Sequence, residues 1–399
     1  MTPQIISSDV VIIGAGIAGL WLHNRLNQMG FHAVLLENDT IGNAQTLSSQ
    51  GIIHGGAKYA LNGILSKATQ AIGDMPARWQ DCLSGRGDVD LTGVKILAKH
   101  QLMWSKDKLS SKLLSFFASK ALASRMQTVP KSERPNLFQH ADFKGTLYQL
   151  DEPVLDILSV LKCLAKPNQD RILHYPKNWP ITWHHEGENI QSIQLGDDTI
   201  IKAQHFVLTA GEGIEKILRT LNFSKPDMQL RPLQMVLCKA KDKKNSLPAI
   251  YAHSLGSGSK PIATISSHAD DEGNIIWYIG GNIAEEGMNK PLSQLSAEAE
   301  KLLAQIMPWY KLPKLLWAGH SVNRAEPKQS SLTRPDSAFV DSKHNVHVAW
   351  PTKLALAPDL ADQVIKQLTK QNLQRKVHKT TNKLSPAVIG DTLWNTAFK

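Results

Sequence analysis

Two short apolar runs flank a segment with helical periodicity near the start of the chain. Asp9 to Ile13 is rich in β-branched residues, as is typical of a strand buried on both faces of a parallel sheet. From Gly16 to Met29 apolar residues recur at helical spacing, and Gly30 is a natural C-terminal stop. Ala33 to Glu37 is the second buried run. Residues 9 to 37 are therefore predicted to form one β-α-β unit.

The rest of the chain is predicted to contain mainly short strands. Three strands joined by turns, and then a buried strand, are expected at Ile181 to Trp183, Ile190 to Leu195, Thr199 to Lys202 and His205 to Thr209. Runs typical of an antiparallel sheet lie at Leu233 to Leu237, Pro261 to Ile265 and Ile275 to Ile279. A helix is expected from Ser296 to Met307, ended by Pro308. It is followed by a buried strand from Asn345 to Trp350 and by a helix from Asp359 to Leu368, with Pro358 in its first turn. The chain after Lys370 is basic and weakly patterned, so we expect it to be poorly ordered or peripheral.

The turn after the first strand carries the pattern G-x-G-x-x-G, from Gly14 to Gly19. In that pattern Gly14 allows the tight turn, Gly16 lets the backbone approach a pyrophosphate, and Gly19 lets helix and strand pack closely. The helix N-terminus offers N–H groups and partial positive charge to phosphates. Glu37 ends the second strand, where a carboxylate binds ribose hydroxyls and disfavours NADP. Glycines in a sharp turn also have structural uses, but the whole strand-turn-helix-strand-acid order favours a dinucleotide site.

Composition narrows the class of protein. With 42% hydrophobic and 20% charged residues in 399, the chain is typical of a globular protein of two domains. Cys82, Cys163 and Cys238 lie far apart, so neither a zinc site nor a disulfide framework is indicated, and a reducing, cytoplasmic compartment is expected. The sequence has no run of ~20 apolar residues to span a bilayer, and its start lacks the basic region of a signal peptide.

The formal charge of +10 leaves the partner open between an anionic substrate, an anionic membrane surface and nucleic acid. A solvated basic surface is the plainer interpretation, because much of the excess lies in Lys366 to Lys383. Leu109 to Met126 combines apolar and basic residues. It either lies on the inner membrane surface, as peripheral contact, or packs as a helix of the second domain, which we favour. Nucleic acid is the least favoured partner.

A glycine- and serine-rich segment from Ser48 to Tyr59 lacks the β-α-β continuation of an NAD-dependent dehydrogenase. It resembles the flavin-contacting segment of the glycine oxidase/D-amino-acid oxidase superfamily. Gly51 to Ala60 is most similar to FAD-dependent glycerol-3-phosphate dehydrogenases and L-2-hydroxyglutarate oxidases. Further segments that resemble the family, in the same order, are Leu150 to Asp156, Phe206 to Gly211 and Asn345 to Val364. The resemblance spans roughly residues 8 to 370 and implies an FAD-dependent oxidoreductase of small substrates.

The resemblance implies an α/β fold with an α+β second domain: a Rossmann-type FAD-binding fold and a discontinuous, mainly antiparallel substrate domain. We expect the FAD-binding domain at 1–85, 145–225 and 335–372, the substrate domain at 86–144 and 226–334, and a basic C-terminal tail at 373–399. The implied FAD contacts are Gly14, Gly16, Ile17, Ala18, Gly19, Glu37, Asn38, Ser48, Ser49, Gln50, Gly51, Ile53, Ala210, Gly211, Pro351, Thr352, Lys353 and Leu354.

The sequence departs from the family at the turn before the last helix. Relatives commonly have a glycine-rich turn there, whereas this chain has Trp350 to Pro358. Lys353 stands where backbone N–H groups normally face the N1–C2=O edge of the flavin. A cation at N1 favours hydride acceptance at N5, so Lys353 is a catalytic candidate. The alternative is a solvent-exposed lysine in a loop.

Histidine and arginine supply the other catalytic candidates. His54 is the best candidate for a base that removes a hydroxyl or amine proton, although a histidine that only hydrogen-bonds the backbone fits nearly as well. Arg324 is the candidate for an anion clamp, with Arg334 and Arg231 in reserve. The remaining substrate-facing candidates are Tyr59, Tyr251 and Tyr278, whose alternative is core packing.

No metal site or hydrolase motif is indicated, and His184 and His185 are interpreted as surface residues. We therefore expect an FAD-dependent dehydrogenase or oxidase that takes a hydride from a hydroxy acid, an amino acid or amine, or glycerol phosphate. The alternatives are an NAD-binding protein, an FAD-binding protein without turnover, and a flavoprotein acting on a nucleic-acid-linked substrate. Electron acceptor and oligomeric state are not indicated.

Overall fold

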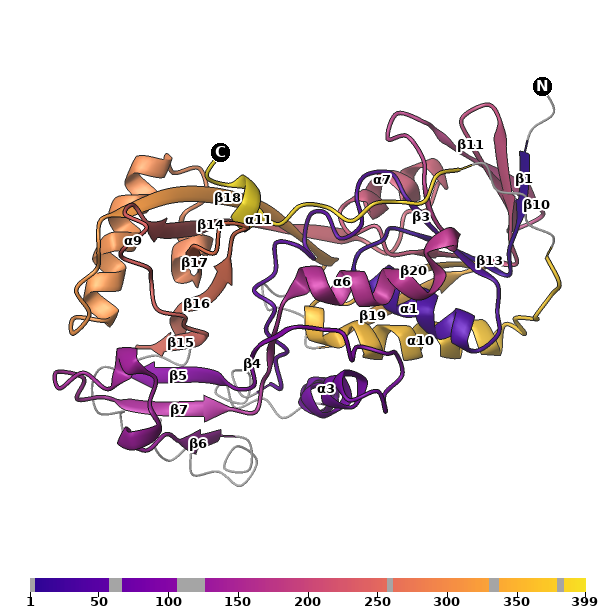
Figure 1. The fold of residues 1–399 in the computed structure, drawn as a ribbon. Helices are drawn as coiled ribbons and strands as arrows, with labels where there is room; N and C mark the ends of the chain where they lie inside the picture. Colours follow the sequence, from indigo (N-terminus) through magenta and orange to yellow (C-terminus); the bar gives the residue numbers. More distant parts are fainter. Residues whose placement is uncertain (1–3, 57–66, 106–125, 257–260, 330–336, 379–383) are drawn as a thin grey trace.

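The structure is a computed structural model that describes residues 4–56, 67–105, 126–256, 261–329, 337–378 and 384–399. The molecule is elongated and has two lobes (Figure 1). One lobe, here called the nucleotide lobe, is built on a six-stranded and a four-stranded sheet. The other, the sheet lobe, is built on an eight-stranded sheet.

The six-stranded sheet has the order β19-β20-β13-β2-β3-β9, and only the β19–β20 pair is antiparallel. Its strands are β2 (Val10–Ile13), β3 (Ala33–Glu37), β9 (Ile172–His174), β13 (His205–Leu208), β19 (Phe339–Lys343) and β20 (Val346–Trp350). Helix α1 (Ile17–Gln28) connects β2 to β3, so the predicted β-α-β unit is confirmed.

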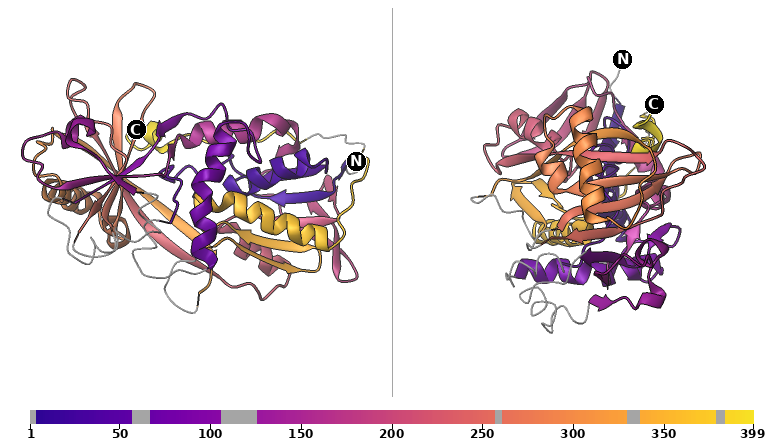
Figure 2. Two further views of the ribbon diagram at one scale, coloured as in Figure 1. Left: turned by 90° about the horizontal axis from the view of Figure 1, so that it is seen from below. Right: turned by 90° about the vertical axis from the view of Figure 1, so that its left-hand side faces the viewer.

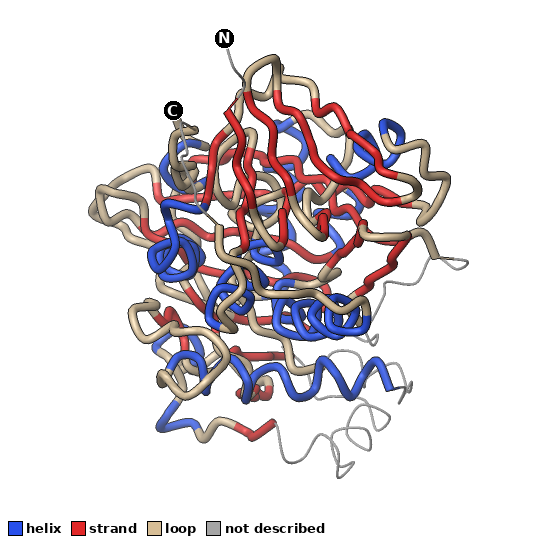
Figure 3. Tube along the Cα trace, turned by 90° about the vertical axis from the view of Figure 1, so that its right-hand side faces the viewer, coloured by secondary structure: helices blue, strands red, loops and turns tan. Residues whose placement is uncertain are grey.

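Both faces of this sheet are covered, which explains its continuous apolar runs. Val10 and Ile12 face a core shared with the helices, whereas Val11 and Ile13 face the opposite core. The first core includes α1, α3 (Lys67–Leu83), α6 (Ile157–Ala165) and α10 (Ala357–Lys370). The second includes α7 (Gly213–Thr220) and the four-stranded sheet of β1 (Gln4–Ser7), β10 (Ile181–Glu186), β11 (Asn189–Leu195) and β12 (Thr199–Lys202). Figure 3 shows these strands above a row of helices.

The eight-stranded sheet has the order β18-β14-β17-β16-β15-β5-β7-β6 and is antiparallel except for β15–β5. Its strands are β5 (Gln101–Ser105), β6 (Met126–Thr128), β7 (Thr146–Leu150), β14 (Met228–Ala240), β15 (Ala252–Leu255), β16 (Pro261–Ala269), β17 (Ile275–Gly281) and β18 (Leu315–Pro327). The smaller elements are β4 (Ile96–Ala98), β8 (Val154–Leu155), α8 (Asn282–Glu286), η1 (Lys131–Glu133), η2 (Asn136–Phe138), η3 (Lys166–Arg171) and η4 (Leu354–Leu356). Two views of both lobes are given in Figure 2.

Two elements of the sheet lobe are longer than the sequence predicted. Strand β14 extends well beyond the predicted Leu233 to Leu237, because it pairs with β18 over its whole length and forms a two-stranded ribbon. Helix α9 (Leu292–Ile306) begins four residues before Ser296. Its first turn is fixed by Leu295, which is buried in the sheet-lobe core. The predicted fold class is confirmed, and the domain boundaries stay predictions.

Of the two expectations for the end of the chain, poorly ordered or peripheral, residues 384–399 fit the second, because they pack on the surfaces of both lobes. There, Pro386 and Ile389 form isolated bridges with Leu173 and Ile41 of the nucleotide lobe. Helix α11 (Leu393–Thr396) then packs on the sheet lobe, where Trp394 stacks on His268 with ring centroids 3.7 Å apart. Figure 1 shows this segment, in yellow, crossing from one lobe to the other. The predicted membrane or core helix at Leu109 to Met126 falls almost wholly outside the described residues.

Candidate functional site

The turn between β2 and α1 has the geometry of a phosphate site. Gly14 has a φ of 108°, and a Cβ there would lie 2.6 Å from Cα of Ala210. A Cβ on Gly19 would lie 2.1 Å from the carbonyl oxygen of Gly14. No side chain caps α1 at Gly16, and its first turn contains no acidic residue. The amide of Ile17 donates to the Thr46 hydroxyl at 3.1 Å, and beyond that bond the positive end of the helix faces the turn and favours an anion.

Glu37 is held at the carboxyl end of β3 by the backbone. Its carboxylate accepts hydrogen bonds from the amides of Ala15, at 2.7 Å, Asn38, at 2.9 Å, and Asp39, at 3.0 Å. Burial raises the pKa of Glu37, and the three backbone hydrogen bonds oppose that rise. The carboxylate is thus fixed beside the glycine turn, where the sequence predicted ribose binding.

Two more segments complete the mouth of the site. The Thr209 hydroxyl donates to the carbonyl of Gly14 at 2.9 Å, and this bond joins the end of β13 to the glycine turn. The Trp350 indole donates to the carbonyl of Gly211 at 3.3 Å, which adds the end of β20. The carboxyl ends of parallel strands β2, β13 and β20 therefore meet where open α/β sheets bind ligands. Sequence reasoning missed Thr46, whose hydroxyl accepts from the amide of Ile17 at 3.1 Å.

The segment from Ser48 to Gly56 lies between the two lobes. The Ser48 carbonyl accepts from the Tyr278 hydroxyl at 2.9 Å, and its own hydroxyl lies 2.8 Å from Nε2 of His320. Gln50 donates to the carbonyls of Thr264 and Tyr278, at 3.1 and 3.0 Å. The hydroxyl of Ser49 is buried without a hydrogen-bond partner among the described residues. An unsatisfied buried hydroxyl of this kind is expected where a polar ligand supplies the missing bond.

The same segment is anchored to β8. The carbonyl of Gly51 accepts from the amide of Leu155 at 2.9 Å, and the amide of Ile53 donates to the carbonyl of Pro153 at 2.9 Å. These bonds leave His54 at the end of the paired stretch. Its Nδ1 lies 3.1 Å from Oε2 of Glu152, a carboxylate that is almost fully buried.

Glu152 makes a second bond that fixes its orientation. Its Oε1 accepts from the amide of Gly55 at 2.7 Å, so both carboxylate oxygens are directed at the glycine-rich segment. The ring of His54 also stacks on His253, with centroids 5.9 Å apart and an interplanar angle of 13°. His253 lies on β15, and its Nδ1 is 2.7 Å from the Thr264 hydroxyl. His54 is therefore held by the sheet lobe on one side and by Glu152 on the other.

The turn after β20 differs from a glycine-rich loop in a specific way. Thr352 adopts a φ of 60°, a left-handed conformation that a glycine would adopt without strain, and its hydroxyl donates to Ser337 at 3.0 Å. Lys353 is buried, with 5% of its surface exposed, so it is not the solvent-exposed loop lysine of the alternative interpretation. Leu354 then begins η4, and Trp79 of α3 donates to the carbonyl of Ala355 at 3.0 Å.

Arg324 lies on β18, directly opposite Arg231 of β14. Both are half-buried, and Oε1 of Glu285 is 4.0 Å from Arg324 and 3.9 Å from Arg231. The neighbouring residue Asn323 donates to Glu212, which follows Gly211 at the mouth of the nucleotide site. The structure thus brings the ribbon arginines to the boundary between the lobes.

Comparison with known proteins identifies the chain. Residues 9–349 match the family model described as FAD dependent oxidoreductase (DAO). The chain belongs to the DAO family of FAD-dependent oxidoreductases. It is 42% identical over 397 residues to the probable FAD-dependent oxidoreductase PA4991 of Pseudomonas aeruginosa, a match that covers 99% of this chain and 100% of that protein.

Solved structures agree with this assignment. The crystal structure of PA4991 superposes with a TM-score of 0.86 at 37% identity and covers 98% of this chain and 99% of that one. An L-α-glycerophosphate oxidase from Mycoplasma pneumoniae, solved with FAD bound, gives a TM-score of 0.62 at 13% identity, which shows a shared fold. The match covers 96% of this chain and 99% of that chain. The predictions of enzyme class and of FAD as the cofactor are confirmed.

The residues of this oxidoreductase fit FAD. The α1 N-terminus, which has glycine at its N-cap and no acidic residue in its first turn, suits the pyrophosphate, and Glu37 suits the ribose of the adenosine half. The buried Ser49 hydroxyl lies in the segment predicted to contact the flavin half. Which atoms each residue contacts stays a prediction. Among the described residues, no group of histidine, cysteine and acidic side chains is arranged to hold a metal ion. None of the described helices is long and apolar enough to cross a membrane.

Two of the tyrosine candidates, Tyr278 and Tyr251, have surroundings that the structure describes. The Tyr278 hydroxyl is used by Ser48, and burial raises its pKa, so the structure favours the packing interpretation. Tyr251 lines a cavity of about 280 Å³ in the sheet lobe, together with Phe138. Burial raises the pKa of Tyr251 to about 12. Tyr59 and Arg334 lie outside the described residues.

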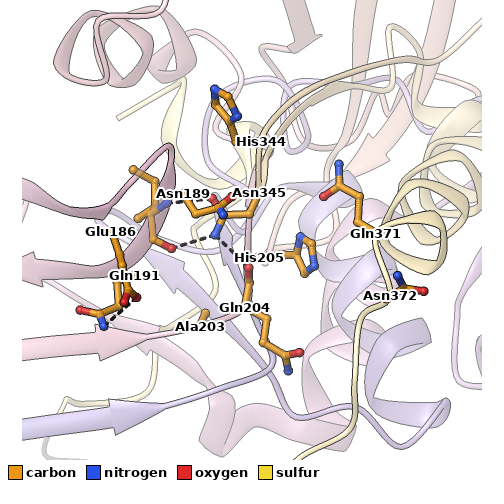
Figure 4. A pocket seen from close by; sticks show the side chains of 11 residues that line it. Glu186, Asn189, Gln191, Ala203, Gln204, His205, His344, Asn345, Gln371 and Asn372 are labelled. Carbon is orange, nitrogen blue, oxygen red and sulfur yellow. Dashed lines mark hydrogen bonds between the residues drawn. The ribbon is translucent and has the colours of Figure 1, made fainter.

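A larger cavity, of about 600 Å³, lies at the opposite end of the six-stranded sheet (Figure 4). It is lined by His205, the first residue of β13, whereas the glycine turn meets Thr209 and Ala210, which follow the last residue of that strand. Its polar groups mostly support the fold: the Asn345 amide bonds to the carbonyls of Ile190 and Gln204. Burial lowers the pKa of His205 to about 4, so this imidazole is neutral at pH 7. The cavity therefore lies away from the predicted FAD contacts at the glycine turn.

Glu152, His253 and His320 contact predicted site residues, His54 and Ser48, but were not singled out from the sequence. Glu152 lies within Leu150 to Asp156, a segment already noted for its resemblance to the family, so an acid facing the glycine-rich segment could have been sought there. The histidines carry no local signal, because His320 is paired with Met235 and His253 with Met103, which are both distant in sequence.

Proposed function

We propose that this oxidoreductase takes a hydride from a small anionic hydroxy acid, amino acid or amine, or from glycerol phosphate. The observation that carries the proposal is the contact of His54 with Glu152, next to the predicted flavin-contacting segment. FAD supplies the hydride acceptor when bound. The protein must then supply a base for the proton, a group that binds the anionic part of the substrate, and a surface that excludes water.

His54 is proposed as the base. A carboxylate can only accept hydrogen bonds, so the proton of the neutral imidazole is on Nδ1, which faces Glu152. Nε2 then carries the lone pair that accepts the proton of a substrate hydroxyl or amine. Stacking on His253 fixes the plane of the ring, which keeps Nε2 pointing in one direction.

Arg324 is proposed to bind the anionic group, because its planar fork matches a carboxylate or phosphate. Lys353 and the first turn of α10 would hold the pyrimidine edge of the flavin. The burial of Lys353 in the turn between β20 and η4 supports that placement. We also propose a cytoplasmic location, with peripheral contact of the inner membrane surface as a separate question for vesicle sedimentation.

The test is anaerobic reduction of the purified yellow protein by separate pools of hydroxy acids, amino acids and amines, and glycerol phosphates. We expect one pool to bleach the flavin absorbance. The His54→Asn variant should still bind FAD, but its FAD should be reduced by the substrate at least about 10²-fold more slowly, because a general base typically contributes that much to the rate. His185→Asn, at an exposed histidine, is the matched control and should match the wild type. Failure of every pool, or an unaffected His54→Asn, contradicts the proposal.

A further inference from the structure

Residues 385–397, here called the terminal strap, run from the edge of the six-stranded sheet to the sheet lobe. The amide of Ala387 donates to the carbonyl of Ile172 at 2.8 Å, and Ile172 belongs to β9, an edge strand of that sheet. The next residue of the strap, Val388, accepts from the amide of Ile41 at 2.8 Å. The strap therefore lies between the edge of the sheet and the loop that follows β3.

The strap packs closely on the loop that leads into the predicted flavin-contacting segment. Gly390 donates its amide to the carbonyl of Ile41 at 3.1 Å. A Cβ on Gly390 would lie 2.6 Å from Oγ1 of Thr40 and 2.9 Å from Cδ1 of Leu47, so only glycine fits here without a shift of these side chains. Leu47 is buried and directly precedes Ser48. The strap therefore touches a residue next to a predicted FAD contact.

Helix α11 attaches the far end of the strap to the sheet lobe (Figure 1). The indole of Trp394 stacks on His268 of β16, with ring centroids 3.7 Å apart and an interplanar angle of 3°. The same indole meets the ring of Tyr278 edge-on, with centroids 6.2 Å apart and an angle of 70°. The Tyr278 hydroxyl donates to the Ser48 carbonyl at 2.9 Å. Three packed rings therefore connect the strap to the backbone of Ser48 by a second path.

The contacts of His268 fix the position of this ring cluster. Burial lowers the pKa of His268 to about 3, so the imidazole is neutral and no charge is buried under the indole. Nε2 of His268 lies 2.9 Å from the Ser266 hydroxyl, which orients the ring. Stacked and edge-on aromatic pairs attract each other beyond the effect of the area that they bury. A cavity in place of the indole would therefore free Tyr278 to move away from Ser48.

We propose that Trp394 is a positioning residue for FAD, which acts through Tyr278 to hold Ser48 and the predicted flavin-contacting segment against the cofactor. The inference concerns the retention of FAD and does not depend on which substrate is oxidised. Ser49, next to the held carbonyl, has a buried hydroxyl without a hydrogen-bond partner among the described residues. Movement of Ser48 would carry this hydroxyl away from the ligand that it is expected to bind. FAD and the docked strap should therefore stabilise each other, because the coupling between two sites is reciprocal.

The first experiment measures the release of FAD from the diluted holoenzyme by the rise in flavin fluorescence. Trp394→Ala should release FAD at least about tenfold faster than the wild type, equivalent to about 1.4 kcal/mol. Trp394→Phe keeps a ring on His268 and should stay within about threefold of the wild type. Trp309→Ala is the matched control, because Trp309 is also buried in the sheet lobe but packs on Phe143 in a different core cluster.

The control separates positioning from general stability. Trp309→Ala should destabilise the protein about as much as Trp394→Ala in denaturant unfolding, since both changes remove a buried indole. It should nevertheless release FAD within about threefold of the wild-type rate. Equally fast release from both alanine variants would assign the effect to lost stability and contradict the proposal. Wild-type release from Trp394→Ala would contradict it as well.

A second experiment uses the wild type alone and so stands even if Trp394→Ala does not fold. Amide hydrogen exchange is compared with FAD bound and after its removal. FAD should slow the exchange of the Gly390 amide, which donates to Ile41, at least about tenfold. Helix α9, in the core cluster of Trp309, is the internal reference and should change by less than about threefold. Unchanged exchange at Gly390, or equal slowing in α9, overturns the inference.

Discussion

Replacing Glu152 by glutamine tests the proposed base without changing the shape of the site. In the wild type Oε1 accepts from the Gly55 amide at 2.7 Å and Oε2 lies 3.1 Å from Nδ1 of His54. The glutamine oxygen must stay on the Gly55 amide, which is a donor. The new NH₂ group then faces Nδ1 and donates to it. The ring proton of His54 moves to Nε2, and the base loses the lone pair that accepts the substrate proton.

The size of the effect follows from these contacts. Loss of a positioned general base typically costs about 10² to 10⁴ in rate, so flavin reduction should slow by at least about 10². The bond from Gly55 is retained, so FAD affinity should change by less than about threefold. Stability should fall by only about 1 kcal/mol, the difference between a charge-assisted and a neutral hydrogen bond. A merely structural role for Glu152 would instead alter FAD binding and stability more than the rate.

The assay is anaerobic stopped-flow reduction between pH 5 and 9, with the substrate that bleaches the wild type. Glu188→Gln is the matched control, because Glu188 also lies beside a histidine, 3.4 Å from His344, but is exposed. Equal reduction rates and equal pH profiles for Glu152→Gln and the wild type would refute the reasoning. So would a slow variant whose rate recovers fully when FAD is supplied in excess.

Three further predictions concern the cofactor, the termini and acid stability. Lys353→Met should lower the flavin reduction potential by about 30 mV or more, equivalent to about 1.4 kcal/mol for two electrons, and an unchanged potential in a dye-equilibrated titration removes that role. Trp394→Ala should destabilise the protein by about 3 kcal/mol in denaturant unfolding, because the indole is buried against His268. Burial lowers the pKa of His23, His268 and His347 to about 3. Because the unfolded chain binds more protons below the ordinary histidine pKa of about 6.5, the free energy of unfolding should fall as the pH drops from 6.5, by up to about 1.4 kcal/mol per pH unit for each histidine. Above pH 7 these histidines should leave the thermal unfolding midpoint independent of pH.

The parts of the fold that local signals determine were predictable. The apolar run from Val10 to Ile13, the glycine turn and the helix from Ile17 all depend on neighbours within a few residues, and they form as expected. Strand β18 was not predicted, because polar and apolar residues mix on both of its faces. Its regularity comes from pairing with β14, from Leu315 opposite Ala240 to Pro327 opposite Met228. Pattern rules detect burial on one face of an element, and this ribbon passes between lobes where neither face is uniformly apolar.

The candidate site also contains residues that local sequence signals predict and residues whose partners are distant in sequence. The glycine-rich segment and His54 are visible in sequence because they are local and resemble a family. Their partner Glu152 is separated from His54 by 98 positions, and no spacing rule joins them. The pairing of Arg231 with Arg324 likewise depends on strand register, which one sequence does not determine across a long connection. Chemistry-bearing residue types could be listed from sequence, but their pairing required the fold.

The contacts of the end of the chain were not predicted, because single residues such as Ala387 and Trp394 are buried there without a periodic pattern. No periodicity arises when Ile389 bridges Ile41 and Trp394 enters a separate site on His268, since these contacts come from different surfaces. The amide of Ile41 also donates to the carbonyl of Val388 at 2.8 Å, so the terminal segment is bonded to the stretch just before Thr46 and Ser48. That stretch supplies the acceptor for the first turn of α1 and the contacts to the sheet lobe. The terminal segment therefore connects the predicted FAD contacts to the eight-stranded sheet by a second route, and a basic composition is no evidence that such a segment is dispensable.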